Sequence, residues 1–398
     1  MVLELELELE LELPSERTMM KSALIIGGTQ FIGRHCVERL LKNGGWNVWL
    51  LNRGKTPSPF SVSEERVQYC RCDRLNDGKA FRRHLASRSW DLVVDFVCFC
   101  AENARDAVKG LERDDGSFDT KLYVLISTDS VYMATNAIDS RAITEDASAR
   151  NLRPTTVSEI TSVRNHDAYQ FQYGNGKLGA EDVLLEAYAE SGFPATILRL
   201  PDVFGEYNNL DGFLDLFNDI EAGRCVASKP GWNKRDGNKY PKSWVKEHRI
   251  SMVYAPDVAS AVVACFNDPA KVAGHAFHIA SGIASIWQVY EQVRSSLNKL
   301  RESRGLPPCA PLVPDYSRSV YFPSVDIGPL CIKKAQRLLG WAPTPISEWL
   351  HKSVEWYTDE RNKEYSRRLA ESSSDSDSDS ESDSDNKGSA SFKFNFFS

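Results

Sequence analysis

Three side chains near the middle of the chain have the types and spacing of a proton-transfer site. Tyr173 and Lys177 stand four residues apart in the string Y-G-N-G-K, so on a helix they share one face. Thr128 ends an apolar run and stands four residues before Tyr132. A phenol is a poor base at neutral pH, but a nearby ammonium favours its anion. We therefore predict acid–base chemistry on a carbonyl or alcohol carbon, with Tyr173 moving the proton and Thr128 polarising the oxygen.

A glycine-rich turn near the beginning of the chain predicts a site for a pyrophosphate. The string G-G-T-Q-F-I-G follows the first apolar run and opens the first amphipathic helix. Gly27 permits a tight turn, Gly33 lets helix and strand pack closely, and the free N–H groups of the helix bind an anion. The positive nicotinamide of an oxidised cofactor would also favour the phenolate of Tyr173. We predict that NADP or NAD is bound by Gly27, Thr29, Gln30, Phe31, Ile32 and Gly33.

The residues after the second and third predicted strands bear on which dinucleotide is bound. The second strand ends in N-R-G-K, without the acid that would bind the ribose 2′-hydroxyl of NAD. Arg53 and Lys55 suit a 2′-phosphate, which favours NADP; the alternative is a pair of solvated loop cations. Asp73 follows the third strand, where its carboxylate or the flanking amide is expected to contact the adenine amino group.

The elements that must position these residues alternate between strand and helix. Apolar runs predict strands at 23–26, 47–51, 67–70, 92–96, 122–126 and 195–198, with helices at 31–42, 79–87, 101–111 and 169–190 between them. This order predicts an α/β fold, a Rossmann doubly wound parallel sheet with the ligand at the carboxyl ends of its strands. We predict an NAD(P)-binding Rossmann domain at 20–200 and an interleaved, smaller substrate-binding lobe at 201–360, with helices near 211–222, 257–266, 286–300 and 346–359.

Both ends of the chain differ in composition from the rest. Residues 1–19 form a low-complexity leader of alternating Leu and Glu, which indicates a disordered or weakly helical segment or a translation start at Met19 or Met20. Residues 371–398 form an acidic tail that cannot bury enough apolar surface to fold, so we expect disorder. Several serines have an acid three residues later, which is the spacing that an acidophilic kinase recognises. The alternative is a tail that serves only solubility. The phenylalanines at the end predict either strand addition or an unstructured end.

The overall composition excludes several classes of protein. The net charge of −7 lies in the two tails, at −5 each, so the central part is mildly basic at about +3. Nine scattered cysteines indicate reduced thiols, and their C-x-C pairs lack the spacing of a zinc site, so we expect no metal. No apolar run is long enough for a membrane span, which predicts a cytoplasmic protein that makes no membrane contact.

A basic and aromatic segment at 229–249 leaves several ligands open. It contains seven Lys and Arg against two acids, with Trp232, Tyr240 and Trp244 among them. Such a loop suits the diphosphate of a nucleotide sugar, or single-stranded RNA with weaker support. The other interpretation is a solvated loop whose aromatic residues pack inward.

These motifs together resemble the extended short-chain dehydrogenase/reductase family, the NAD-dependent epimerase/dehydratase group. The resemblance covers residues 21–357 and includes L-R-L-P-D-V-F-G from Leu198, S-M-V-Y-A-P-D-V-A from Ser251 and L-G-W-A-P from Leu339. It implies that Tyr173 is the catalytic acid/base, Lys177 its partner and a ribose ligand, and Thr128 the polarising hydroxyl. Relatives often form homodimers, and such a dimer is the assembly that the resemblance implies.

One departure from the family pattern concerns the cofactor turn. The middle glycine of G-x-x-G-x-x-G is Gln30 here, which puts a side chain where the phosphates approach. The turn also resembles an atypical branch that includes chloroplast stem-loop-binding proteins, some of which act on RNA. The preferred hypothesis is an NAD(P)-dependent oxidoreductase, epimerase or dehydratase, with a nucleotide sugar as one candidate substrate. The alternative is a nonenzymatic protein on the same fold that senses NADP(H) or binds RNA.

Overall fold

The computed structural model describes most of the chain. The described residues are 20–60, 64–134, 142–148, 165–208, 212–228, 244–319, 322, 324–325 and 327–374. They divide into two compact units, Met1–Glu355 and Trp356–Ser398. The leader at 1–19, most of the basic segment and the tail after Ser374 lie outside the described residues.

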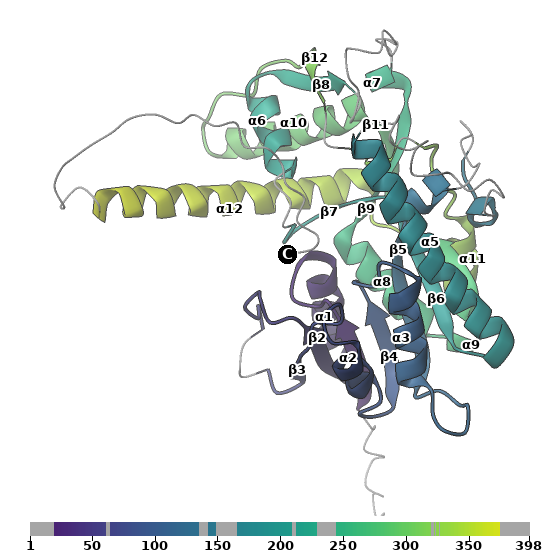
Figure 1. Cartoon of the computed structure of the whole chain (residues 1–398). Helices are drawn as coiled ribbons and strands as arrows, with labels where there is room; N and C mark the ends of the chain where they lie inside the picture. The colour runs from purple at the N-terminus through teal and green to yellow at the C-terminus, as the bar shows by residue number, and fades with distance from the viewer. Residues whose placement is uncertain are drawn as a thin grey trace, which may run out of the picture. The chain divides into compact units, whose positions relative to one another are not determined.

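A seven-stranded sheet forms the centre of the first unit (Figure 1). Its order is β10-β6-β5-β4-β1-β2-β3, and every neighbouring pair is parallel. Six strands are at the predicted places, and the Rossmann-type parallel fold is confirmed. The strands are β1 (Lys21–Ile26), β2 (Trp46–Asn52), β3 (Val67–Arg71), β4 (Trp90–Asp95), β5 (Thr120–Thr128), β6 (Ala195–Leu200) and β10 (His275–His278).

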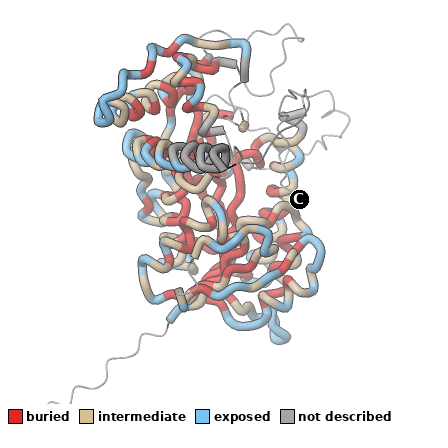
Figure 2. The backbone as a smooth tube through the Cα atoms, turned by 90° about the vertical axis from the view of Figure 1, so that its left-hand side faces the viewer, coloured by how far each residue is buried: buried red, intermediate tan, exposed pale blue. Residues whose placement is uncertain are grey.

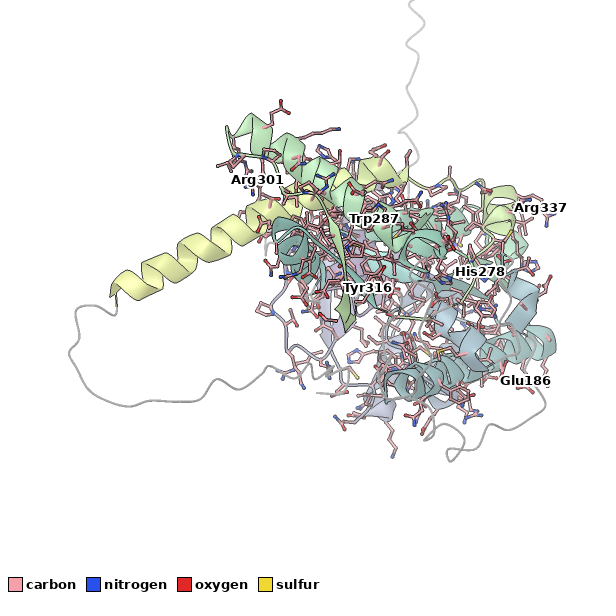
Figure 3. All side chains as sticks on the ribbon, turned by 90° about the horizontal axis from the view of Figure 1, so that it is seen from above. Glu186, His278, Trp287, Arg301, Tyr316 and Arg337 are labelled. Atoms are coloured by element: carbon pink, nitrogen blue, oxygen red, sulfur yellow. The ribbon has the colours of Figure 1, made fainter. Side chains whose placement is uncertain are left out.

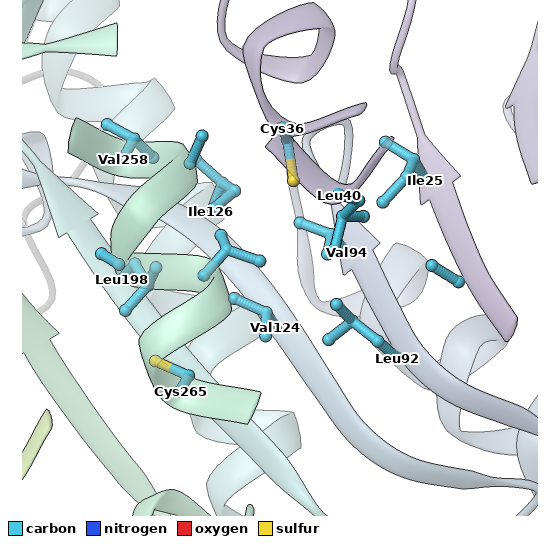
Figure 4. Close-up of a cluster of buried hydrophobic side chains, with 14 of the residues drawn as sticks. Ile25, Cys36, Leu40, Leu92, Val94, Val124, Ile126, Leu198, Val258 and Cys265 are labelled. Atoms are coloured by element: carbon cyan, nitrogen blue, oxygen red, sulfur yellow. The ribbon is translucent and has the colours of Figure 1, made fainter. Parts of the chain in front are cut away.

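Helices cover both faces of this sheet, which is why its strands are apolar on both sides. On one face, α1 (Phe31–Asn43) and α8 (Ala255–Phe266) pack their apolar stripes on the strands (Figure 4). The other face carries α2 (Gly78–Leu85), α3 (Ala101–Leu111) and α5 (Asn165–Ser191). Figure 2 shows buried backbone running through the layer between them. The carboxyl ends of all seven strands therefore share one edge of a rigid layer.

The seventh strand comes from the second half of the chain and was not predicted. Beyond β6 the chain forms two smaller sheets, β11-β9-β7 and β12-β8. Between β9 and β11 it returns to the central sheet and adds β10 beside β6. Their strands are β7 (Asp202–Phe204), β8 (Arg224–Ser228), β9 (Arg249–Tyr254), β11 (Gly282–Ser285) and β12 (Val313–Ser319). The remaining helices are α6 (Gly212–Glu221), α7 (Trp244–Glu247), α9 (Pro269–Val272), α10 (Ile286–Ser303), α11 (Lys333–Leu339) and α12 (Ile346–Ser374), with 3₁₀ turns η1 (Asp129–Ala134) and η2 (Glu145–Ser148).

Helix α12 is longer than the sequence pattern predicts. The expected end was at Asp359, whereas the helix continues to Ser374 and includes the first four residues assigned to the acidic tail. Apolar periodicity stops near Tyr357, but helical charge pairs continue, as between Lys363 and Glu360. The helical region thus extends beyond the part that apolar spacing can reveal.

Candidate active site

The turn between β1 and α1 has the close packing that a dinucleotide pyrophosphate requires. Gly27 has φ of +92°, and a Cβ on Gly33 would lie 2.2 Å from the carbonyl oxygen of Gly27. Helix α1 therefore rests on the backbone of the turn with no room for a side chain. Its first turn holds no acidic residue, so its N–H groups and dipole stay favourable for an anion. The glycine turn fits NAD(P), as the sequence predicts.

The residues between these glycines have different environments. Gln30 is exposed and extended, with φ of −131°, and its side chain makes no capping hydrogen bond to α1. Phe31 has φ of +38°, a strained region for a bulky residue. Thr29 and Ile32 are half-buried, and Ile32 packs against the core of the α1 face. The side chain of Gln30 thus faces solvent beside the start of α1, and the local strain falls on Phe31.

The two residues predicted to meet the adenosine lie at the ends of β2 and β3. Arg53 is half-buried and Lys55 exposed, in a turn where the Asn52 side chain accepts a hydrogen bond from the Gly54 amide at 2.8 Å. The carboxylate of Asp73 accepts hydrogen bonds from the Leu75 amide at 3.1 Å and from the Asn76 side chain at 3.0 Å. That carboxylate organises its own loop, so the contact of Asp73 with adenine stays a prediction.

Thr128 ends β5, two strands from β1 in the sheet. Neighbouring strands lie about 4.8 Å apart, so the ends of β5 and β1 are separated by roughly 10 Å along the same edge. Thr128 is buried, and its hydroxyl accepts a hydrogen bond from the Ser130 amide at 3.1 Å. This bond fixes the side chain at the first turn of η1.

Tyr173 and Lys177 lie together on the inner face of α5, as predicted. The Nζ atom of Lys177 is 5.9 Å from the Tyr173 ring centroid and donates a hydrogen bond to the Ile126 carbonyl at 2.7 Å. Lys177 is almost fully buried, while Tyr173 is half-buried and stacks on Tyr169 with ring centroids 6.4 Å apart. The ammonium thus connects α5 to β5 two residues before Thr128.

The glycines of Y-G-N-G-K explain how the helix comes so close. A Cβ on Gly174 would lie 1.9 Å from the Ser130 carbonyl oxygen, and one on Gly176 would lie 2.6 Å from the Phe99 carbonyl oxygen. The backbone of α5 therefore touches η1 on one side of the pair and the loop after β4 on the other. Larger residues at either glycine would push Tyr173 and Lys177 away from the strand ends.

Burial dominates the protonation of the site. It raises the pKa of Tyr173, and the neighbouring Tyr169 and Asp129 add to this rise. Burial also lowers the pKa of Lys177, against the opposing influence of Cys98 and Asp95. The groups of the protein alone therefore keep the Tyr173 phenol protonated at neutral pH, in the state that donates a proton.

Asp129 is a member of the site that sequence reasoning missed. It follows Thr128 directly, is buried, and has a pKa raised well above the usual range by burial and by the nearby Asp202. A rise of this kind favours the protonated carboxyl group, which can act as a hydrogen-bond donor. The signal in the sequence was an acid at the end of a buried strand, beside the predicted hydroxyl.

Two buried ion pairs beneath the site were also missed. Arg74 donates to Asp95 at 2.6 Å, and Asp95 also accepts from the Tyr123 hydroxyl at 2.6 Å. Arg199, in the fully buried strand β6, pairs with Glu181 of α5 at 2.6 Å. For the pair of Arg199, the available signal was a lone arginine inside an apolar strand, since such a charge needs a buried partner.

The basic segment lies largely outside the described residues, which leave out 229–243. At its described end, the Lys246 ammonium lies 4.7 Å from the Trp287 ring centroid. Arg249 donates to Gln288 at 3.0 Å and to the Ile283 carbonyl at 3.1 Å. These two cations contact their own chain, and binding of RNA or of a diphosphate by the segment stays a prediction.

The described residues offer neither a cluster of metal ligands nor a helix suited to a bilayer. Within residues 20–374, apart from the gaps given above, no three His, Cys, Asp or Glu side chains are grouped as metal ligands. Over the same part of the chain, no helix combines the length and hydropathy of a bilayer span.

The parallel sheet, the glycine turn at its first helix and the Tyr173–Lys177 pair beside the end of β5 define a short-chain dehydrogenase/reductase. Comparison with known proteins agrees. Residues 23–280 match the NAD dependent epimerase/dehydratase family, and the chain belongs to that family. It is an NAD(P)-dependent enzyme of the oxidoreductase and epimerase type, as the sequence motifs predict.

Individual relatives are distant. The 2'-dehydrokanamycin reductase of Streptomyces kanamyceticus is 25% identical over 288 residues, which are 72% of this chain and 69% of the relative. The NAD complex of dTDP-glucose 4,6-dehydratase from Bacillus anthracis superposes with a TM-score of 0.59 at 16% identity, over 87% and 98% of the two chains. For UDP-glucuronic acid 4-epimerase from Bacillus cereus with NAD, the TM-score is 0.58 at 19% identity, over 85% and 99%. Resemblance to the chloroplast stem-loop-binding branch stays a prediction.

Proposed function

We propose that this enzyme transfers hydride at a carbonyl or alcohol carbon of a nucleotide-linked sugar, with Tyr173 as the acid/base. The supporting observation is that Gly174 and Gly176 bring α5 against η1 and the loop after β4, so that Lys177 bonds to β5, the strand that ends at Thr128. The substrate class is supported by the dTDP-glucose dehydratase and UDP-glucuronic acid epimerase among the structural neighbours. It is further supported by the basic composition of the segment at 229–249.

Each residue has a separate task in this proposal. The Thr128 hydroxyl donates a hydrogen bond to the substrate oxygen, and the Tyr173 phenol gives or takes the proton of that oxygen. Lys177, held by the Ile126 carbonyl, stabilises negative charge on the phenol when the proton has left. NAD(P), when bound at the turn of Gly27 and Gly33, supplies or accepts the hydride. Because burial keeps Tyr173 protonated, the site favours proton donation, as carbonyl reduction requires.

We propose NADP(H) as the preferred dinucleotide and the cytosol as the location. Arg53 follows β2 in place of an acid and is half-buried at the edge where the 2′-phosphate would lie. Cysteines at all nine positions are unpaired, which suits a reducing compartment. Equal affinity for NADH and NADPH, measured by quenching of protein fluorescence, would remove the first of these assignments.

Tyr173→Phe tests the proposed chemistry, because it removes the phenolic hydroxyl and keeps the ring. Purified protein is screened with NADPH and NADH against UDP- and dTDP-linked sugars and their keto forms, and turnover is followed at the absorbance of the reduced nicotinamide. We expect Tyr173→Phe to lower kcat by about 1000-fold or more with NADPH affinity unchanged. Tyr169→Phe is the matched control, since it alters the stacked neighbour and should keep most activity. Full activity of Tyr173→Phe would exclude the proposed role.

A further inference from the structure

The buried ion pair between Arg199 and Glu181 contacts both ends of the segment that carries Thr128. Glu181 stands one helical turn after Lys177 on α5 and is fully buried. Arg199 contributes two groups to it, with Nη2 at 2.6 Å and Nε at 3.1 Å from Oε2. An ion pair without solvent is held to one geometry, because its hydrogen bonds are costly to break in the interior.

At one end of the segment, the Ser127 hydroxyl donates to Glu181 Oε1 at 2.5 Å. At the other end, Arg199 Nη1 donates to the Tyr132 hydroxyl at 2.9 Å, and also to the Glu145 carbonyl at 3.0 Å. Ser127 and Tyr132 flank Thr128, Asp129 and Ser130 on either side. One ion pair thus fixes the start and the end of the turn on which the predicted hydroxyl stands.

The far side of Tyr132 continues this network to the edge strand. The Tyr132 hydroxyl is hydrogen-bonded to Nε2 of His278, which ends β10. The backbone amide of His278 donates to Glu145 Oε1 at 3.0 Å, and the ring contacts the Cys331 carbonyl at 3.2 Å. Figure 3 shows His278 among packed side chains, whereas Glu186 and Arg337 lie at the periphery. The Tyr132 end therefore has no freedom to follow a movement of Arg199.

We propose that Arg199 and Glu181 are positioning residues that hold Thr128 at a fixed distance from Tyr173. The inference rests on the proposed function for its catalytic consequence, but its geometric part does not. Helix α5 carries Tyr173, Lys177 and Glu181 on one face, so the ion pair joins the helix of the acid/base to the strand end of the polarising hydroxyl. The other contacts that join this turn to α5 are the Lys177 hydrogen bond, the Gly174 approach and a hydrogen bond from the Ser130 hydroxyl to the Gln170 side chain at 3.0 Å.

Two substitutions separate this role from simple stabilisation. Arg199→Lys keeps a positive charge for Glu181, but a single ammonium cannot match the planar fork that reaches Glu181 and Tyr132 together. Ser127→Ala leaves the ion pair whole and removes only its link to the start of the segment. We expect both to lower kcat by about 10- to 100-fold with little change in KM or in NADPH affinity.

A third substitution, Tyr132→Phe, should show the same pattern. Tyr123→Phe is its matched control, because that buried hydroxyl on β5 bonds to Asp95 and not to Arg199.

Hydrogen exchange gives a readout that needs no substrate. In Arg199→Lys and Ser127→Ala, amide exchange should accelerate in peptides that cover residues 127–134 and remain unchanged in peptides of β1 and α1. In Tyr123→Phe, peptides 127–134 should exchange as in the wild type. Uniform acceleration over the whole sheet, or none at 127–134, would overturn the positioning role. If the proposed function is wrong, Tyr173→Phe will retain activity. The exchange result tests the positioning role independently of that outcome.

Discussion

At the scale of single residues, the site depends on two glycines, because a side chain at either position would hold α5 away from its neighbours. Gly174 and Gly176 give α5 its close approach, although glycine costs helix stability of about 1 kcal/mol relative to alanine. The catalytic candidates Tyr173 and Lys177 flank these glycines on the same helix. The two glycines therefore weaken the helix locally, and in return they let α5 place a phenol and an ammonium beside β5.

Gly174→Ala tests this role through its effects on stability and on activity. If the glycine has no contact role, alanine should stabilise the helix by about 1 kcal/mol and leave activity intact. The structure predicts the opposite, because the new Cβ would meet the Ser130 carbonyl oxygen and the helix must move outward. We expect a loss of about 100-fold in kcat and a lower unfolding midpoint. Gln172→Ala, an exposed position on the same helix, is the control and should alter neither.

Gln30 allows a residue-scale test of the cofactor turn. Its backbone is extended, which any residue tolerates, and its side chain makes no capping bond to α1. Gln30→Gly should therefore leave the fold intact and give the phosphates closer access to the N–H groups. We expect the Kd of NADPH, measured by calorimetry, to fall by up to about tenfold. An unchanged or larger Kd would mean that the glutamine side chain does not oppose the cofactor.

At the scale of elements, predictions from the sequence were reliable where burial alone decides structure. Helix α3 has the predicted bounds, and β6 was recognised from its apolar run at 195–198, a run that the structure buries completely. Strand β10 was missed, since four residues with two histidines, His275 and His278, show no apolar run. It becomes a strand only because β6 offers an open parallel edge. Pairing of this kind depends on the tertiary fold and leaves no local pattern.

The residues of the candidate site also differ in whether a local pattern could predict them. Tyr173 and Lys177 could be paired from their spacing because they share one helix, and Thr128 from its place at a strand end. Arg199 could be recognised as unusual, but its partners stand 18 and 67 residues away in the chain, at Glu181 and Tyr132. Sequence spacing within one element predicts a pair, whereas a network across three elements requires the packed sheet.

The capping box of α10 gives a test at the level of one helix. The Ser285 side chain accepts from the Gln288 amide at 3.3 Å, and the Gln288 side chain accepts from the Ser285 amide at 2.8 Å. Ser285→Ala should lower the free energy of unfolding by about 1 kcal/mol, measured by urea denaturation with an unchanged m value. Ser303→Ala at the other end of α10 is the control and should change stability by less than about 0.5 kcal/mol. Equal effects at both ends would argue against the capping contribution.

At the scale of the whole molecule, stability should depend on the protonation of His278. Burial lowers its pKa to about 3, helped by the cations Arg199 and Lys334, while the Cys331 carbonyl opposes the shift. A neutral ring can donate from Nδ1 to that carbonyl and accept the Tyr132 hydroxyl at Nε2. The ordinary pKa of 6.5 applies once the chain unfolds. Between these two values, the unfolded chain binds a proton that the folded chain excludes.

The free energy of unfolding should therefore fall as the pH drops below about 6.5, and the fall should continue towards pH 3. From pH 7.5 to 5.5 this single histidine contributes a loss of about 1.4 kcal/mol. Urea denaturation of the wild type and of His278→Asn at both pH values isolates the effect, because asparagine keeps a donor near the Cys331 carbonyl but takes up no proton. The variant is expected to be less stable at pH 7.5 and to lose about 1.4 kcal/mol less on acidification. If both proteins lose the same amount, His278 is already accessible to protons in the fold, and the network from Glu181 through Arg199 and Tyr132 does not end in a sealed interior.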